Sequence, residues 1–172
     1  MLVVACQQED AEEKQRKTIE SYVGDSYETF DGIYFKQLRH PLCDTTIINC
    51  TLTETGDTIS CDTVQFPGCQ RVVRGSRVTF LYTARILRGA VFATTDTVVA
   101  ASNNVFPQPP YTVVVGQEGL VAGVERALLH TVVSDSVHVV FPFTLGYGAE
   151  NYVGIVPPSS AQEWTISVIG IN

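Results

Sequence analysis

The sequence has few charged residues and very few basic ones. Only 17% of its 172 residues are charged, and 11 Lys and Arg stand against 18 Asp and Glu, for a formal net charge of −7. Proteins that bind the phosphate backbone need a basic surface, so this composition argues against nucleic acid as a partner. No apolar run reaches the roughly 18 residues that a membrane-spanning helix requires. The 45% apolar share is enough for the core of one folded domain.

The negative charge is concentrated at the N-terminal end. Residues 1–31 hold eight acidic and three basic residues, so −5 of the net charge lies there. Residues 9–23 favour a helix, because acidic residues come first and basic residues later, and Gly24 is a suitable stop. Ile19, Tyr22 and Val23 form its only apolar edge. We therefore expect residues 7–31 to be an acidic tether and a helix that precedes or caps the domain.

The first six residues, Met-Leu-Val-Val-Ala-Cys, form an apolar stub that ends in a cysteine. They resemble the end of a bacterial lipoprotein signal, in which the residue matching Cys6 becomes lipidated. The stub lacks a basic region and a full-length apolar core, so an apolar N-terminus with a stray cysteine is the alternative. The resemblance implies that residues 1–6 are a signal remnant and that Cys6 anchors the protein to a membrane. The expected location is the bacterial cell envelope, with the protein facing the periplasm or the cell surface at the outer membrane.

The other four cysteines lie within 27 residues: Cys43, Cys50, Cys61 and Cys69. They lack the close C-x-x-C pairs of zinc ribbons, and the nearby His40 is a single histidine, so we expect no metal site. An even number in a segment rich in Thr, Asp and Gly favours two disulfides that pin a surface excursion over residues 39–70. Three connectivities are possible, and the spacing does not choose among them.

Several segments alternate apolar and polar residues with the period of a β-strand. The clearest is 77–87, where every second residue from Val78 to Ile86 is apolar. Residues 120–128 instead show helical spacing. These patterns therefore predict an α+β domain with an antiparallel β-sheet around one short amphipathic helix. The loop 96–110 is long enough to form a functional flap. Further strands are expected at 32–38, 112–115, 137–143 and 163–171.

Three sequence blocks follow one another in the C-terminal part of the chain. They are Val-Thr-Phe-Leu-Tyr-Thr-Ala-Arg-Ile-Leu-Arg-Gly-Ala-Val-Phe at 78–92, Val-Gly-Gln-Glu-Gly-Leu-Val-Ala-Gly-Val-Glu at 115–125, and Leu-Gly-Tyr-Gly-Ala-Glu-Asn-Tyr-Val-Gly-Ile-Val-Pro-Pro at 145–158. Their order and spacing resemble those of the FKBP-type peptidyl-prolyl isomerases. The resemblance implies an FKBP-like domain over residues 32–172, with the cysteine excursion 39–70 as an insertion, and it implies no cofactor.

The resemblance also implies an aromatic pocket that binds prolyl segments of peptides or unfolded proteins. In that family the amide N–H matching Val121 and the hydroxyl matching Tyr147 hold the carbonyl groups of the ligand. The chemistry agrees, because twisting a prolyl imide calls for a dry apolar pocket and carbonyl donors, and not for a nucleophile or a metal. The implied catalytic positions are Tyr82, Phe92, Tyr147 and Trp164. The implied substrate-contacting positions are Tyr111, Leu120, Val121, Val124, Tyr152 and Val156.

Three positions depart from the pattern of the family. The residue after Phe92 is usually an aspartate in active members and is Ala93 here, and the helix position that often carries a tryptophan is Val124. Tyr152 stands where a histidine is frequent. Two functions therefore remain open. One is a prolyl isomerase, and the other is a non-catalytic module of the same fold that binds peptides or acts as a chaperone.

Overall fold

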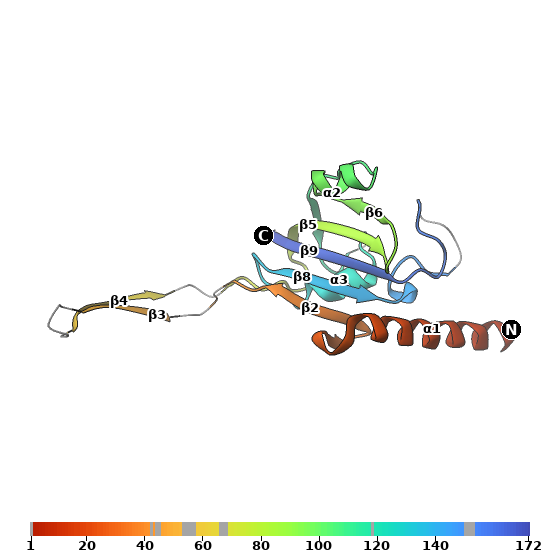
Figure 1. The fold of residues 1–172 in the computed structure, drawn as a ribbon, viewed down its shortest axis with the longest axis horizontal. Helices are drawn as coiled ribbons and strands as arrows, with labels where there is room; N and C mark the ends of the chain where they lie inside the picture. Colours follow the sequence, from red (N-terminus) through yellow and green to blue (C-terminus); the bar gives the residue numbers. More distant parts are fainter. Residues whose placement is uncertain are drawn as a thin grey trace.

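The computed structural model describes residues 2–41, 43, 46–52, 58–65, 69–117, 119–149 and 154–172. Within these residues the main element is a seven-stranded antiparallel sheet in the order β1-β2-β8-β9-β5-β6, with β7 paired to β5 beside β6 (Figure 1). The predicted antiparallel sheet is thus confirmed. Its strands are β1 (Glu28–Phe30), β2 (Ile33–Arg39), β5 (Arg77–Ile86), β6 (Val91–Thr94), β7 (Tyr111–Val114), β8 (Ser136–Phe141) and β9 (Gln162–Ile171).

Strand β5 shows how the sequence forms this sheet. The side chains of Val78, Phe80 and Ala84 are fully buried, whereas Leu81, one position out of step, is 38% exposed. Alternate residues of a strand point to opposite faces, so one face of β5 belongs to the core and the other does not. The predicted alternation over 77–87 is confirmed. On either side, β5 pairs with β9 over almost its whole length and with β6 and β7 in succession.

The short helix α3 (Ala122–Leu128) packs on the inner face of the sheet. Its side chains Val124, Ala127 and Leu128 are fully buried among those of β5, β8 and β9. Gly123 faces the ring of Phe141 so closely that a Cβ at this position would overlap the ring. The sequence predicted this helix over 120–128, and it begins two residues later because Leu120 and Val121 lie in the extended turn before it.

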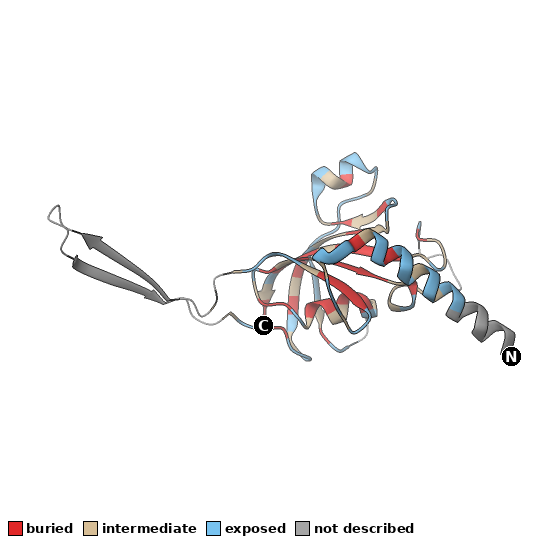
Figure 2. Ribbon diagram, turned by 60° about the horizontal axis from the view of Figure 1, so that its bottom comes forward, coloured by how far each residue is buried: buried red, intermediate tan, exposed pale blue. Residues whose placement is uncertain are grey.

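A second helix, α1 (Leu2–Val23), lies against the outer face of the sheet (Figures 1 and 2). Ile19 and Val23 are buried against Tyr34 of β2 and Val140 of β8, which confirms the predicted apolar edge. The helix begins seven residues before the predicted start at Glu9. It is followed by the short 3₁₀ turn η1 (Gly24–Ser26). Among the described residues, no helix combines the length and the hydropathy needed to cross a membrane.

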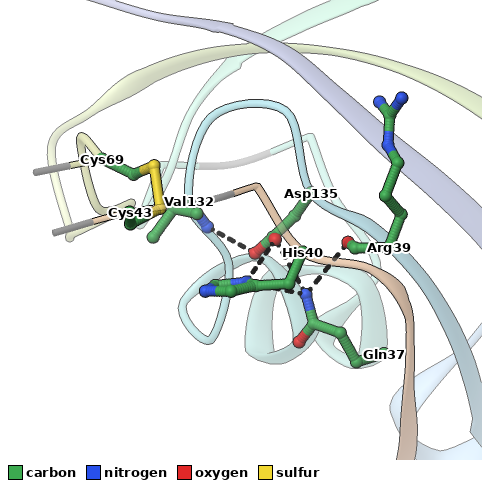
Figure 3. The surroundings of a disulfide bond; sticks show 7 residues. All are labelled: Gln37, Arg39, His40, Cys43, Cys69, Val132 and Asp135. Carbon is green, nitrogen blue, oxygen red and sulfur yellow. Dashed lines mark hydrogen bonds and ion pairs between the residues drawn. A yellow bond between two sulfur atoms is a disulfide. The ribbon is translucent and has the colours of Figure 1, made fainter. Parts of the chain in front are cut away.

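The insertion between β2 and β5 contains the hairpin of β3 (Thr46–Leu52) and β4 (Thr58–Gln65), which pair with each other (Figure 1). At its base Cys43 and Cys69 form a disulfide (Figure 3). The structure thus selects one bridge from the open connectivities. In the hairpin register the Cα of Cys50 lies opposite that of Cys61, and the side chains of these two cysteines lie outside the described part.

A buried carboxylate ties the base of this insertion to the sheet (Figure 3). Asp135 is 1% exposed, and its oxygens accept hydrogen bonds from the amide of Val132 at 2.7 Å and from Gln37 Nε2 at 2.7 Å. His40 Nδ1 lies 2.8 Å from the same carboxylate. A buried carboxylate is stable only when its oxygens are satisfied in this way.

The loop 96–110 contains the helix α2 (Thr97–Ser102), which the sequence patterns did not predict. Asp96 begins it, because its carboxylate accepts the amide N–H groups of Val98 at 2.8 Å and Val99 at 3.0 Å. Strand β8 also ends at Phe141 and not at residue 143. Pro142 has no amide N–H for a sheet ladder, and the 3₁₀ turn η2 (Phe143–Leu145) follows it.

Two tyrosines of the N-terminal segment bond to a histidine and a glutamate on the outer face of the sheet. Tyr22 donates to Glu163 Oε2 at 2.5 Å, and the Tyr27 hydroxyl lies 2.8 Å from His138 Nδ1. Glu163 is 3% exposed. Burial lowers the pKa of His138 below its ordinary value of 6.5, although the Glu163 carboxylate opposes this effect. The folded protein therefore favours the neutral imidazole.

We predict that acid weakens the fold through His138. The unfolded chain binds a proton at this residue near its ordinary pKa, and the folded chain binds it only at lower pH. The free energy of unfolding should therefore decrease as the pH falls below 6.5, until the lower folded-state pKa is passed. Urea unfolding at pH 7.5, 6.5 and 5.5 should show this decrease in the parent and a smaller one in His138→Gln. His130→Gln, at an exposed histidine, is the control, and an equal decrease in all three proteins would contradict the prediction.

Candidate functional site

A cavity of about 160 Å³ opens at one end of the inner face of the sheet, beside the start of α3. Its walls are mostly aromatic and aliphatic, and among the described residues that line it none has a carboxylate, an amine or an imidazole. Ordinary binding sites for small ligands combine such apolar walls with a few polar groups that orient the ligand. The lining residues are Phe80, Tyr82, Ala93, Tyr111, Gly119, Leu120, Val121, Tyr147 and Trp164.

The aromatic rings form a continuous wall. Tyr82 and Trp164 are stacked, with ring centroids 5.3 Å apart and planes 24° apart. Phe92 meets Trp164 edge to face at 6.0 Å, and it meets Tyr147 in the same manner at 6.0 Å. Tyr111 stands perpendicular to Tyr82 at 6.4 Å. Stacked and edge-to-face pairs of this kind stabilise one another beyond the area that they bury, so the wall is held in a definite shape.

The register of the sheet brings these rings together. Ala84 of β5 lies opposite Trp164 of β9, and Tyr82 lies opposite Ile166, so the rings of Tyr82 and Trp164 are diagonal neighbours on one face. Tyr111 opens strand β7, where its Cα pairs with that of Phe80. The remaining wall comes from Leu120 and the other residues before α3 and from the turn after η2 that carries Tyr147.

Hydrogen-bond donors are available at the wall. Tyr111 already donates to the carbonyl of Gly119 at 2.9 Å, which closes the turn before α3. Burial raises the pKa of Tyr82 and of Tyr147, so both phenols are protonated at neutral pH. In the described part of the chain, neither of these two hydroxyls has a hydrogen-bond partner. Val121 is the N-cap residue of α3, and the amide N–H of an N-cap residue has no partner inside its helix.

Most of the residues predicted from the sequence meet at this cavity. Phe92 stands behind the wall and contacts the rings of Trp164 and Tyr147. Val124 and Val156 are fully buried but do not line the cavity, and Tyr152 lies outside the described residues. Those that line it are Tyr82, Tyr111, Leu120, Val121, Tyr147 and Trp164.

Sequence reasoning did not assign Phe80 and Gly119 to the site. Phe80 had the alternation of a core residue, and it is one, but its ring also reaches the cavity next to Tyr111. Gly119 has a φ of +125°, a conformation that glycine adopts without strain, and its carbonyl binds Tyr111. The sequence marks Phe80 as a core residue and Gly119 as a turn residue, but only the folded structure shows that both line the cavity.

Three other hollows contain none of the predicted site residues. One, of about 350 Å³, lies between α1 and the residues Phe143 and Ala161. A second, of about 400 Å³, also lies along α1 and includes Glu13, Arg16 and Glu20, whose charges already pair with each other at 2.6 and 3.2 Å. The third, of about 310 Å³, surrounds Glu163 and His138 on the outer face. The aromatic cavity is therefore the candidate site.

The chain belongs to the FKBP-type peptidyl-prolyl cis-trans isomerase family, whose sequence profile matches residues 68–169. A curated relative, peptidyl-prolyl cis-trans isomerase FKBP9 of Rattus norvegicus, is 29% identical over 104 residues. This region is 60% of the present chain and 17% of the rat protein, so the chain spans about a sixth of the length of that relative.

Solved structures share the fold. A peptidyl-prolyl cis-trans isomerase of Pseudomonas syringae has a TM-score of 0.62 and 17% sequence identity, with 95% of both chains covered. FkpA of Escherichia coli has a TM-score of 0.60 and 14% identity, with 98% of the present chain and 63% of FkpA covered. The structure of the three FKBP domains of wheat FKBP73 has a TM-score of 0.57 and 19% identity, with 86% and 49% covered. At these identities the likeness concerns the fold, and it confirms the predicted FKBP-like class.

We predict that Gly123→Ala destabilises the domain, although alanine is normally the better helix residue by about 1 kcal/mol. The added methyl group would overlap the buried ring of Phe141 and push α3, with Val121 at its start, away from the sheet. We expect a loss of about 1–3 kcal/mol in the free energy of unfolding, the usual cost of overpacking a core. Urea unfolding measures it.

The control is the same substitution in a Phe141→Leu background. There the smaller side chain leaves room for the methyl group, and the additional loss caused by Gly123→Ala should shrink. An equal loss in both backgrounds would show that the contact with Phe141 is not the cause.

Proposed function

We propose that the protein binds prolyl segments of peptides or unfolded proteins in the aromatic cavity and accelerates their cis–trans isomerisation. The observation that carries the proposal is the wall itself. Six residues that match the motifs of the family line the cavity, and no described lining residue is charged. The six are Tyr82, Tyr111, Leu120, Val121, Tyr147 and Trp164.

The chemistry follows from the prolyl imide bond. Its barrier of about 18–20 kcal/mol comes from amide resonance, which places partial charges on the oxygen and the nitrogen. An apolar wall that excludes water disfavours this charge separation and so favours the twisted form. The hydroxyl of Tyr147 and the amide N–H of Val121 would hold the carbonyl groups on either side of the twisting bond. A proton transfer is not required, which fits a wall in which the ionisable side chains of the described residues are all tyrosines.

A second candidate function is a module that binds prolyl segments without catalysis. Ala93 lines the cavity where active members of the family usually carry an aspartate, so this position supplies no carboxylate to the wall. Val124 stands where the family often has a tryptophan, and it is buried and does not line the cavity. This position therefore supplies no aromatic floor to the cavity. These two features favour a slower enzyme or a binding protein.

A protease-coupled assay on a short prolyl peptide separates the two functions. We expect the protein to accelerate the slow cis-to-trans phase, and Tyr82→Ala to lower kcat/KM by about tenfold or more because the wall loses a stacked ring. Thr79→Ala is a control, since Thr79 lies on the same strand and outside the cavity. A rate equal to that of buffer, together with quenching of Trp164 fluorescence by the peptide, would identify a binding module.

We also propose that the protein is a lipoprotein of the bacterial cell envelope, anchored through Cys6. The support is the motif at residues 1–6 and the Cys43–Cys69 disulfide, a bond that is typical of proteins outside the reducing cytosol. The acidic and exposed surface of α1 is compatible with a solvated connection between a membrane and the domain (Figure 2).

The anchor is tested in bacterial cells that express the protein and are fed a fatty-acid analogue. We expect the parent to take up the label and to sediment with membranes, and Cys6→Ser to lose both properties while its folded domain remains intact. Cys43→Ser, which removes a cysteine of the disulfide, should still take up the label. A parent protein without label would overturn the anchor and leave the isomerase proposal untouched.

A further inference from the structure

Gln162 is a fully buried polar residue directly behind the cavity. It opens strand β9 and points to the same face as Trp164, two positions later. Its Oε1 accepts the indole N–H of Trp164 at 3.1 Å. Gln162 does not line the cavity itself, so any effect on a ligand must pass through its neighbours.

The indole bond fixes the orientation of the side-chain amide. The Trp164 Nε1–H can only donate, so the oxygen of Gln162 must face it and the NH₂ group must face the opposite way. On that side the amide lies against the Cα of Gly146, where any side chain would overlap Nε2. Gly146 immediately precedes Tyr147. Within the described part of the chain, Nε2 has no hydrogen-bond acceptor.

One amide therefore contacts both opposing parts of the aromatic wall. Through its oxygen it holds the indole of Trp164, which stacks on Tyr82. Through its nitrogen it abuts the turn that carries Tyr147. Leaving a buried donor without a partner costs about 1–3 kcal/mol, so within the described part of the chain this glutamine lowers the stability of the fold. A packing role alone would be served better by an aliphatic residue.

We infer that Gln162 is a positioning residue that sets the distance and the angle between Trp164 and the Tyr147 turn, and thereby the affinity of the cavity for prolyl segments. The inference rests on the proposed function of the cavity. The stacked rings bind the apolar ring of the proline, which the planar and the twisted imide share, so losing the alignment of these rings should raise KM more than it lowers kcat.

The test uses the fact that Trp164 is the only tryptophan of the chain, so intrinsic fluorescence reports on this ring alone. Gln162→Met keeps the length and removes the acceptor. We expect a shifted emission maximum, easier quenching by acrylamide and a KM for the prolyl peptide that rises by about tenfold, the effect of one buried hydrogen bond. In Gln162→Glu, burial favours the neutral carboxylic acid. This acid keeps a carbonyl oxygen for the indole N–H, so the emission and most of the affinity should match those of the parent.

Glu163→Gln is the matched control, because the neighbouring side chain lies on the outer face and bonds to Tyr22. It should leave the emission and KM unchanged. If Gln162→Met does not fold, Gly146→Ala is the second variant, since its methyl group displaces the same amide.

The outcomes separate this inference from the proposed function. A parent protein that neither isomerises nor binds prolyl peptides overturns the function of the cavity. The positioning role alone is overturned if the parent is active and the folded variant, Gln162→Met or Gly146→Ala, has the same emission and KM as the parent.

Discussion

The antiparallel pairing of β5 with β9 is the constraint on which the site depends. Its register sets Ala84 opposite Trp164 and Tyr82 opposite Ile166, so the two rings meet diagonally and stack at 5.3 Å. A shift of one residue would turn one of the rings to the outer face. The pairing runs without a register shift from Phe80 opposite Val168 to Ile86 opposite Gln162, which includes both rings. Side chains distant in the sequence thus form one wall through backbone hydrogen bonds.

The two faces of the sheet carry different kinds of side chain, and α1, on the outer face, also bonds to the segment that forms part of the cavity wall. The inner face carries the uncharged cavity, and the outer face carries the pair of Glu163 and His138 beneath the N-terminal segment. Gln15 of α1 donates to the carbonyl of Ser159 at 2.8 Å and accepts the amide N–H of Phe143 at 2.8 Å. These two residues bracket the segment that carries Tyr147. The helix, which holds five acidic and three basic residues, therefore stabilises a wall of the cavity through the uncharged side chain of Gln15.

Sequence periodicity and the order of the motifs predicted the regular strands and the helix α3. They did not predict features that depend on how a single side chain packs in the folded protein. The alternation around Phe80 and the helical spacing around Leu128 are local properties, so β5 and α3 could be predicted. Gln162 is polar on an apolar face, so the pattern placed the start of β9 one residue too late. The family motif led to Val124 as a floor residue. Its small side chain stays in the core, however, and that depends on packing, which a motif does not encode. The cap at Asp96 carried a signal for α2, but the β-branched residues after it hid the helix.

Binding and catalysis are hard to separate in a cavity of this kind. A ligand seated against Tyr82 and Trp164 loses water, and this loss disfavours the charge-separated planar imide. Each tenfold acceleration requires only about 1.4 kcal/mol from the barrier. A carboxylate at the position of Ala93 would have added a polar contact to this effect without creating it. Ala93 and Val124, which depart from the pattern of the family, therefore limit how strongly the wall distinguishes the twisted imide from the planar one. The donors at Tyr147 and Val121 and the apolar aromatic surface are present. The size of any acceleration is therefore set by how much more strongly the wall binds the twisted imide than the planar one.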